Sequence, residues 1–205
     1  KRQGVFKFQL PQSDDVIFAE NNFEVKLSAG EKKLIPLNFY LFKSCIYSPT
    51  IKIKVDFDQG CQYFILNKSV LFWSGKEKFG GELDKCWVIC NGSHSIFLNK
   101  ADNQIEYRDA SGNSQESCFL YPRVGLPFSS EFYRKKSDKV EFYRESSAYC
   151  MRAIYLSDSF PDLHLISVVK LMDDGLVENY YEIYNLGNDF ARYSNLVFNC
   201  PDKTR

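Results

Sequence analysis

The segment from Phe160 to Asp189, FPDLHLISVVKLMDDGLVENYYEIYNLGND, carries the clearest structural signal in the chain. Two runs rich in apolar and aromatic residues flank the tripeptide Asp173-Asp174-Gly175, which favours a β-hairpin. The first run, Leu163–Leu171, is apolar on both faces, as is typical of an interior strand in a sheet that is covered on both sides. The sequence therefore predicts a long hairpin between Leu163 and Leu186.

The loop of this hairpin can close in two registers. A two-residue turn at Asp174-Gly175 would set Asp173 opposite Leu176, whereas a three-residue loop with a left-handed Gly175 would set Met172 opposite Leu176. In the second register, apolar residues of the two arms face one another and so do opposite charges. We therefore predict the three-residue loop.

The second arm presents different residues on its two faces. Because successive side chains of a strand point to opposite sides, carboxylates and tyrosine rings alternate down one face, which His164 of the first arm also lines. An aromatic ring can stack on the apolar face of a sugar while carboxylates accept its hydroxyls. The alternative is a solvent-exposed face that binds no ligand and whose tyrosines only cover a neighbouring strand. The residues assigned to this candidate ligand-binding surface are Arg123, His164, Glu178, Tyr180, Glu182 and Tyr184.

A period of two residues dominates the rest of the chain as well. In Thr50–Asp58, TIKIKVDFD, one face is apolar and the other carries lysine and aspartate. Turn-rich segments separate further runs of this kind, and no stretch shows a sustained helical period with caps. We therefore predict an all-β fold, an antiparallel β-sandwich. The other predicted strands are Phe6–Leu10, Phe23–Leu27, Lys33–Phe42, Cys61–Leu66, Cys86–Cys90, Ser95–Asn99, Gln104–Arg108, Ser117–Tyr121, Lys139–Arg144, Ala148–Leu156 and Arg192–Phe198.

The polar, glycine-containing segment Ser74–Lys85 is a candidate domain boundary. We expect residues 1–80 to form a small immunoglobulin-like β-sandwich and residues 81–205 to form a larger β-sandwich. The phrase VKLSAGEKKLIPLNF, residues 25–39, suits the smaller module, because a turn containing Gly and Glu separates two strand-like runs. A single continuous sandwich is the alternative.

The bulk composition argues against two kinds of partner. Of the 205 residues, 26 are Lys or Arg and 26 are Asp or Glu, so the net charge is +0 and there is no overall positive field to attract nucleic acid. No apolar run approaches the roughly 20 residues of a membrane helix. We therefore expect no nucleic-acid partner and no membrane span in this region. The chain begins at Lys1 rather than Met, which suggests a fragment or a processed form.

The seven cysteines form no metal-binding motif. No CxxC pair occurs, and with only two histidines the spacing of a zinc finger is absent. Cys86 and Cys90 would lie about 13 Å apart on one face of a strand, which is too far for a disulfide between them. We expect no metal and no cofactor. Free thiols buried in the sheets are the first interpretation, and long-range disulfides are the alternative.

Two N-glycosylation sequons occur, Asn67-Lys68-Ser69 and Asn91-Gly92-Ser93. Chance alone would give about one or two in a chain of this composition, so the sequons do not establish secretion. Together with the cysteines they favour an extracellular or cell-surface location.

The sequence contains no known catalytic motif: G-x-S-x-G, the P-loop and HExxH are all absent. A glycosidase needs two carboxylates about 5–9.5 Å apart, whereas Glu178 and Glu182, four residues apart on one strand, would be separated by about 13 Å. Glu131 or Asp158 could pair with one of them only across the fold. A Cys–His dyad has no local signature. We therefore assign no catalytic residue and favour a protein that is not an enzyme.

Two segments resemble a known family. ENYYEIYNLGN, Glu178–Asn188, following a long apolar strand and an Asp-Gly turn, is similar to segments of the galactose-mutarotase-like supersandwich. That fold occurs in sugar epimerases and as accessory domains of glycoside hydrolases. YPRVGLPFSSEF, Tyr121–Phe132, resembles the Arg, Gly and Pro-Phe stretch that these domains carry near the sugar. The resemblance spans residues 82–200 and implies a supersandwich-like fold in a carbohydrate setting. It carries over no catalytic residue, because neither His94 nor His164 aligns with the family's histidine and glutamate.

These features together predict a non-catalytic β-sandwich module, part of a larger protein, that binds carbohydrate or acts as an accessory or interaction domain. One alternative is a sugar-active enzyme of the mutarotase or glycoside hydrolase kind. The other is a surface or viral glycoprotein domain that binds a protein partner.

Overall fold

The computed structural model describes residues 3–75, 77–109, 111–117, 119–124 and 130–188 with their side chains, and residues 193–199 by their backbone. Throughout these ranges the chain forms strands and turns without a helix, and the sheets are antiparallel. The prediction of an all-β, antiparallel, sandwich-type fold is confirmed. Some predicted features lie outside the described residues: residues 125–129 of the segment that resembles the supersandwich, Cys118, Cys200 and Arg192.

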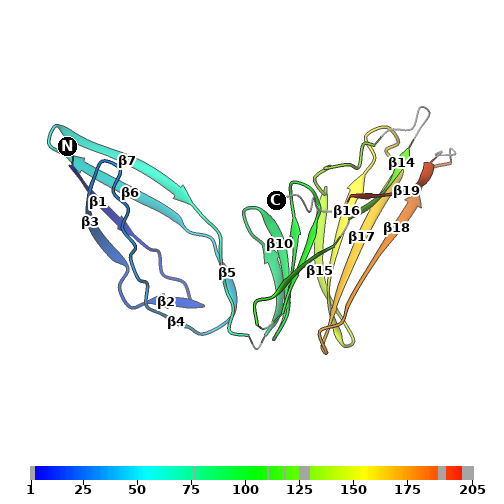
Figure 1. The fold of residues 1–205 in the computed structure, drawn as a ribbon, viewed down its shortest axis with the longest axis horizontal. Helices are drawn as coiled ribbons and strands as arrows, with labels where there is room; N and C mark the ends of the chain where they lie inside the picture. The colour runs from blue at the N-terminus through cyan, green and yellow to red at the C-terminus, as the bar shows by residue number, and fades with distance from the viewer. Residues whose placement is uncertain are drawn as a thin grey trace. The chain divides into compact units, whose positions relative to one another are not determined.

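The chain divides into two compact units, Lys1–Ser74 and Gly75–Arg205. In Figure 1 the first unit is coloured from blue to cyan and the second from green to red. Each unit has its own sheets and its own cluster of buried apolar residues.

The first unit is built on a four-stranded sheet with the order β3-β1-β6-β7, together with the short pairs β2–β4 and β5–β8. Residues from one face of the sheet and from the short pairs form a core around Val16, Phe18 and Ile51. The strands are β1 (Gln3–Gln9), β2 (Val16–Phe18), β3 (Asn22–Ser28), β4 (Phe39–Leu41), β5 (Cys45–Tyr47), β6 (Thr50–Phe57), β7 (Gly60–Asn67) and β8 (Val70–Phe72).

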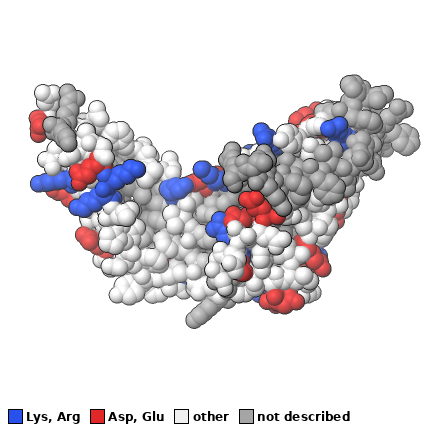
Figure 2. Space-filling model, in the orientation of Figure 1, with Lys and Arg blue, Asp and Glu red and all other residues white. Residues whose placement is uncertain are grey.

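Strand β6 has the alternation that its sequence predicts. Ile51 and Val55 are buried, whereas Lys54 and Asp56 lie on the opposite face, where their side chains form an ion pair of 2.8 Å. Lys7 of the adjacent β1 also reaches Asp56, at 3.3 Å. Basic and acidic side chains accordingly lie next to one another in this unit (Figure 2).

One predicted strand is much shorter than its sequence suggests. Of Lys33–Phe42 only Phe39–Leu41 forms a strand, β4. Pro36 has no N–H to donate to a neighbouring strand, and Leu34, two residues before it, is almost fully exposed. The first half of this run therefore has neither hydrogen bonds nor burial to hold it in a sheet, and the strand prediction for residues 33–38 is wrong.

The second unit contains a five-stranded sheet with the order β13-β12-β11-β10-β9, a four-stranded sheet with the order β15-β16-β17-β18, and the pair β14–β19. Its core collects Trp87 and Ile89 from the larger sheet, Phe119 from β14, and Tyr155 and Leu165 from the smaller sheet. The strands are β9 (Lys78–Glu82), β10 (Cys86–Asn91), β11 (Ser95–Asn99), β12 (Ile105–Arg108), β13 (Ser114–Ser117), β14 (Phe119–Val124), β15 (Lys139–Glu145), β16 (Ala148–Leu156), β17 (Leu163–Met172), β18 (Val177–Asn185) and β19 (Tyr193–Asn199).

Strand β9 lies in the polar segment Ser74–Lys85, which the sequence marks only as a boundary. It pairs with β10, so that Gly80 lies opposite Ile89. A Cβ at Gly80 would approach Phe142 Cδ1 of the smaller sheet to 2.6 Å. The glycine here is therefore a close-packing residue where two sheets meet rather than a sign of a linker.

The hairpin β17–β18 has the predicted three-residue loop. The backbone N–H of Met172 donates to the carbonyl of Leu176 at 2.9 Å, and Gly175 has a φ of 88°. In the same register Leu171 lies opposite Val177 and Lys170 lies opposite Glu178. The predictions for the loop, the register and the backbone of Gly175 are all confirmed.

The β10–β11 turn is docked onto the tip of this hairpin. The Asn91 side-chain N–H donates to the carbonyl of Met172, and its Oδ1 accepts from the backbone N–H of His94 at 3.0 Å. The imidazole of His94 in turn lies against Gly175. Asn91 is buried, so the side-chain amide of the second sequon is a structural link between the two sheets.

Cys86 and Cys90 both lie on β10, and both thiols are free. The prediction that they are not joined to each other is confirmed. Cys61 and Cys150 are also free thiols.

Candidate functional site

Strand β18 forms one edge of the four-stranded sheet, and its side chains alternate between two environments. Tyr181 and Ile183 pack against the core of the second unit. Glu178, Tyr180, Glu182 and Tyr184 have the opposite parity and point to the other side of the sheet, which we call the outer face. The pairing register adds to this face His164, Ile166, Val168 and Lys170 of β17, Cys150, Arg152, Ile154 and Leu156 of β16, and Lys139, Glu141, Tyr143 and Glu145 of β15.

The tyrosines of β18 are solvent-accessible, in contrast to the centre of the same face. Tyr180 is 37% exposed and Tyr184 is 43% exposed. Ile166 and Val168, directly across on β17, are buried, although they face away from the core. The centre of the outer face is therefore inaccessible to solvent, and the rings of β18 form the accessible rim of the surface.

Lys170 connects two parts of the outer face. Its ammonium forms an ion pair with Glu145 and lies 5.5 Å from the centroid of the Tyr180 ring. The hydrogen bond to Glu145 raises the pKa of Lys170 above its usual value. The positive charge is thus held beside the Tyr180 ring, where it makes a cation–π contact.

Tyr184 and Glu182 interact along the edge strand. The Tyr184 hydroxyl donates to Glu182 Oε2 at 3.2 Å, and this hydrogen bond raises the pKa of Tyr184. An ionised carboxylate has about four acceptor positions, so Glu182 retains capacity for donors from a ligand. His164 lies directly across from Tyr184 in the register.

The far side of the outer face is a charge network of its own. Glu141 Oε1 lies 2.7 Å from Lys139 Nζ, and Glu141 Oε2 lies 3.2 Å from Arg152 Nη1. These two cations, Lys139 foremost, lower the pKa of the Glu141 carboxyl. Glu141 is therefore satisfied by its neighbours, and the edge strand is the part of the face best suited to contact a ligand.

Five of the six residues assigned from the sequence share the outer face, and Arg123 does not. Arg123 lies on β14, where it is exposed. That strand packs on the core side of β18, since the Phe119 and Tyr181 rings meet with centroids 5.7 Å apart. The remaining members are His164, Glu178, Tyr180, Glu182 and Tyr184.

A groove of about 370 Å³ lies on the opposite side of β18, beside the hairpin tip. It is lined by Tyr107 of β12, by Gln115 and Ser117 of β13, and by Leu176 and Asn179. Asn179 donates from Nδ2 to the Tyr181 hydroxyl at 3.2 Å, while its buried Oδ1 has no hydrogen-bond partner among the described residues. Sequence reasoning missed this groove, because it forms between edge strands that are far apart in the chain.

The carboxylates considered for a cross-fold catalytic pair have local partners. Glu131 accepts hydrogen bonds from the hydroxyls of Ser157 and Ser159, and Asp158 forms an ion pair of 2.6 Å with Lys135. These bonds tie the turn after β16 to the segment before β15. Both carboxylates therefore have a clear structural role.

His94 is hydrogen-bonded to its neighbour Ser93, with 2.8 Å between Nδ1 and Oγ. Its ring stacks on Tyr107, with centroids 5.6 Å apart, and its Cε1 edge lies against Gly175. A nucleophile needs open space for a reacting carbonyl beside its base. The packed ring is therefore better explained as a part of the sheet-to-sheet contact than as a catalytic base.

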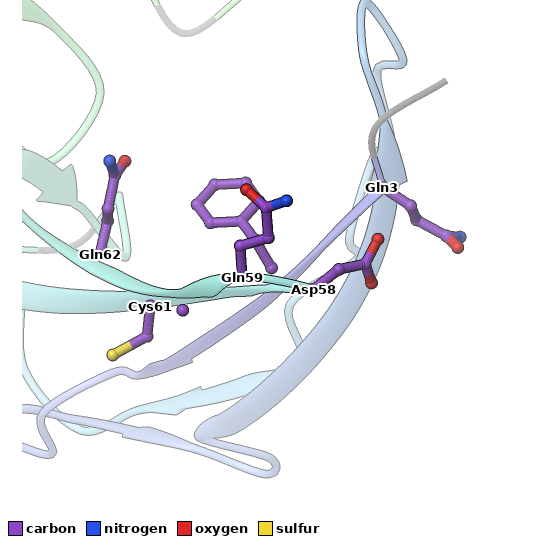
Figure 3. Close-up of a pocket in the computed structure, with 7 residues that line it drawn as sticks. Gln3, Asp58, Gln59, Cys61 and Gln62 are labelled. Carbon is purple, nitrogen blue, oxygen red and sulfur yellow. The ribbon is translucent and has the colours of Figure 1, made fainter.

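The first unit has an open pocket of about 420 Å³ at the β6–β7 turn. Figure 3 shows that Gln59 and Gln62 point to one side of the hairpin, while Cys61 points to the other. These side chains diverge, so they do not form a set of converging polar groups of the kind that fixes a ligand.

The described part of the chain contains neither a metal-binding cluster nor a membrane-spanning helix. No group of three or more His, Cys, Asp or Glu residues within it is arranged to hold a metal ion. In the same residues, no helix has the length and apolar character of a membrane span. Comparison of the sequence with protein-family models and with curated proteins finds no match.

Proposed function

We propose that the second unit is a non-catalytic module that binds carbohydrate through the edge strand β18 on the outer face. The observation that carries the proposal is the pair of accessible tyrosines, Tyr180 and Tyr184, with the Glu182 carboxylate between them on the same face. A sugar has an apolar face that suits an aromatic ring and hydroxyls that suit a carboxylate.

The spacing of the two rings indicates the size of the ligand. Tyr180 and Tyr184 are four residues apart on one strand, which corresponds to about 13 Å along the sheet. A single sugar residue can cover one ring, whereas an oligosaccharide can contact both. We therefore propose an oligosaccharide, held by stacking at two positions and by hydrogen bonds to Glu182 and Glu178.

The same spacing supports binding without hydrolysis. Glu178 and Glu182 are also four residues apart, about 13 Å, and the two carboxylates of a glycosidase lie about 5–9.5 Å from each other. A third carboxylate of this face, that of Glu141, is held in ion pairs with Arg152 and Lys139. The geometry of the outer face therefore favours recognition of the sugar over cleavage.

A glycan array with the 205-residue chain tests the proposal, followed by titration calorimetry with the glycans that bind. Tyr180→Ala and Tyr184→Ala should each weaken binding by about 1–3 kcal/mol, since each removes one stacking ring, while the melting temperature changes little. Tyr133→Ala is the matched control, because Tyr133 is 42% exposed but lies outside the outer face.

Two results would count against this function. One is an array without any bound glycan. The other is a large loss of thermal stability in both tyrosine variants, which would show that the rings cover another part of the protein. Loss of binding in Asn179→Leu, with both tyrosine variants unaffected, would move the sugar site to the groove on the opposite side of β18.

A further inference from the structure

Strand β7 of the first unit is a long edge strand that exposes apolar side chains on both of its faces. Among the strands that the structure describes, it pairs only with β6, in a register that runs without a shift from Thr50 opposite Asn67 to Phe57 opposite Gly60. Tyr63 and Ile65 on one face are 70% and 67% exposed. Phe64 and Leu66 on the other face are also exposed.

The sequence of β7, GCQYFILN, contains none of the features that usually protect a sheet edge. Edge strands in monomeric proteins commonly carry lysine, proline or a bulge, which block pairing with another chain. The opposite edge of the same sheet, β3, follows this rule with Glu24 and Lys26, and Glu24 forms an ion pair with Lys7. Within this single sheet, one edge is therefore protected against pairing and the other is not.

In an antiparallel ladder, every second residue directs its N–H and C=O away from the strand it is paired with. An edge strand of eight residues therefore presents a row of unpaired backbone groups to the solvent. A further strand can satisfy these groups, and its side chains can cover the exposed rings at the same time.

We propose that this strand is a second copy of the chain, bound through antiparallel β7–β7 pairing about a two-fold axis perpendicular to the sheet. A two-fold axis perpendicular to the sheet maps each face of the sheet onto the same face of the second copy. Each side chain of β7 therefore lies beside side chains from the same face of the partner strand. With Phe64 on the axis, Phe64 lies opposite its counterpart and Tyr63 lies opposite Ile65. Aromatic and β-branched pairs of this kind stabilise a sheet.

Charge supports a second copy as the occupant. Strand β7 has no charged residue, so the pairing sets no like charges opposite each other. The lysines of the neighbouring strand, Lys52 and Lys54, lie on β6 opposite Ile65 and Tyr63. In the joined sheet they would be three strand spacings from their counterparts, about 14 Å, beyond the screening length of about 8 Å at physiological ionic strength.

The test is sedimentation velocity over a range of concentrations, with reductant present to exclude cross-linking through Cys61. The wild-type chain should be a reversible dimer. Phe64→Lys should weaken the dimer by about tenfold or more, because two ammonium groups meet on the axis and the contact between the two Phe64 rings is lost. Tyr40→Lys is the matched control and should leave the dimer unchanged, since Tyr40 is 67% exposed but lies on β4.

A charge exchange tests the register itself. Phe64→Lys and Phe64→Glu should each be monomeric alone and should form a mixed dimer together, because opposite charges then meet across the axis. A wild-type chain that stays monomeric at every concentration overturns the proposal. So does a dimer that Phe64→Lys leaves intact. At concentrations where the wild-type chain is also monomeric, all variants should keep its circular dichroism and melting temperature, since Phe64 lies outside the core of the first unit.

Discussion

Gly175 lies directly against the imidazole of His94, with so little space between them that a Cβ built on Gly175 would reach His94 Cε1 at 2.5 Å. This relationship joins the tip of the β17–β18 hairpin to the β10–β11 turn. It gives Gly175 two separate requirements, a left-handed backbone and the absence of a side chain.

Gly175→Val should destabilise the second unit by about 3 kcal/mol. About 1 kcal/mol comes from the positive φ, and the rest comes from displacement of the His94 ring, which is overpacking. Gly112→Val is the matched control. Its φ of 83° is similar, but no atom lies within 4 Å of its Cβ position, so it should cost only about 1 kcal/mol. Urea denaturation measures both. Equal losses in the two variants would show that contact with His94 contributes nothing.

Tyr155→Phe should destabilise the second unit by about 1–3 kcal/mol. The Tyr155 hydroxyl donates to Asn103 Oδ1 at 2.9 Å within the core, and both residues are fully buried. Removing the hydroxyl leaves a buried acceptor without its partner. The comparison is Tyr133→Phe at the surface, which should change stability by less than about 0.5 kcal/mol. Unchanged melting of Tyr155→Phe would mean that Asn103 finds another donor.

The free thiols should react with iodoacetamide at very different rates in the folded protein. Cys61 is exposed and should react first. Burial raises the pKa of Cys90 to about 12 and also raises that of Cys150. These two thiols should stay unmodified at neutral pH until the second unit unfolds, because only the thiolate reacts. Peptide mass spectrometry after timed labelling measures the order. Early labelling of Cys90 would contradict its position in the core.

Stability should fall at alkaline pH. Cys90 has a pKa of about 12 in the folded chain against 9.0 for the free side chain, so the folded state binds this proton more tightly. The resulting stabilisation is complete below pH 9 and is lost as the pH rises towards 12. One such group changes the free energy of unfolding by at most about 1.4 kcal/mol per pH unit.

Cys90→Ala should reduce this dependence between pH 9 and 10, below the range in which Tyr155 begins to contribute, and the part that remains there is expected from Cys150, whose pKa is also raised by burial. Burial raises the pKa of Tyr155 above its usual 10.0 as well, so the loss at higher pH remains in the variant. Urea midpoints at several pH values provide the measurement. If the free energy of unfolding falls with pH equally steeply in wild type and in Cys90→Ala, the loss of stability at alkaline pH is due to other groups.

Local patterns were sufficient to predict most of the fold. The register of the β17–β18 hairpin followed from apolar pairing and from the need for a left-handed Gly175, both of which depend only on neighbouring residues. Strand β9 was missed for the opposite reason. Gly80 looks like a linker residue in the sequence, and only the approach of Phe142 from another sheet explains why a glycine stands there.

The candidate site also has a part that local sequence predicts and a part that depends on packing. Glu178, Tyr180, Glu182 and Tyr184 share a face because strand geometry has a period of two, so the sequence alone placed them together. The position of Arg123 on β14 depends on how that strand packs against β18, which no local pattern encodes. The groove beside Asn179 also depends on packing, since β13 and β18 are brought together only by the folded chain.

The buried position of Asn91 determines when its sequon could be glycosylated. The nitrogen that an oligosaccharyltransferase would modify donates to the carbonyl of Met172 once the sheets have docked, whereas Asn67 at the end of β7 stays exposed after folding. Asn91 could therefore be glycosylated only before the β10–β11 turn docks on the hairpin tip. The attached glycan would then prevent that docking. In a glycosylating compartment, the fraction of chains with a glycan at Asn91 would equal the fraction modified before folding. The fraction with a glycan at Asn67 would not depend on the order of modification and folding.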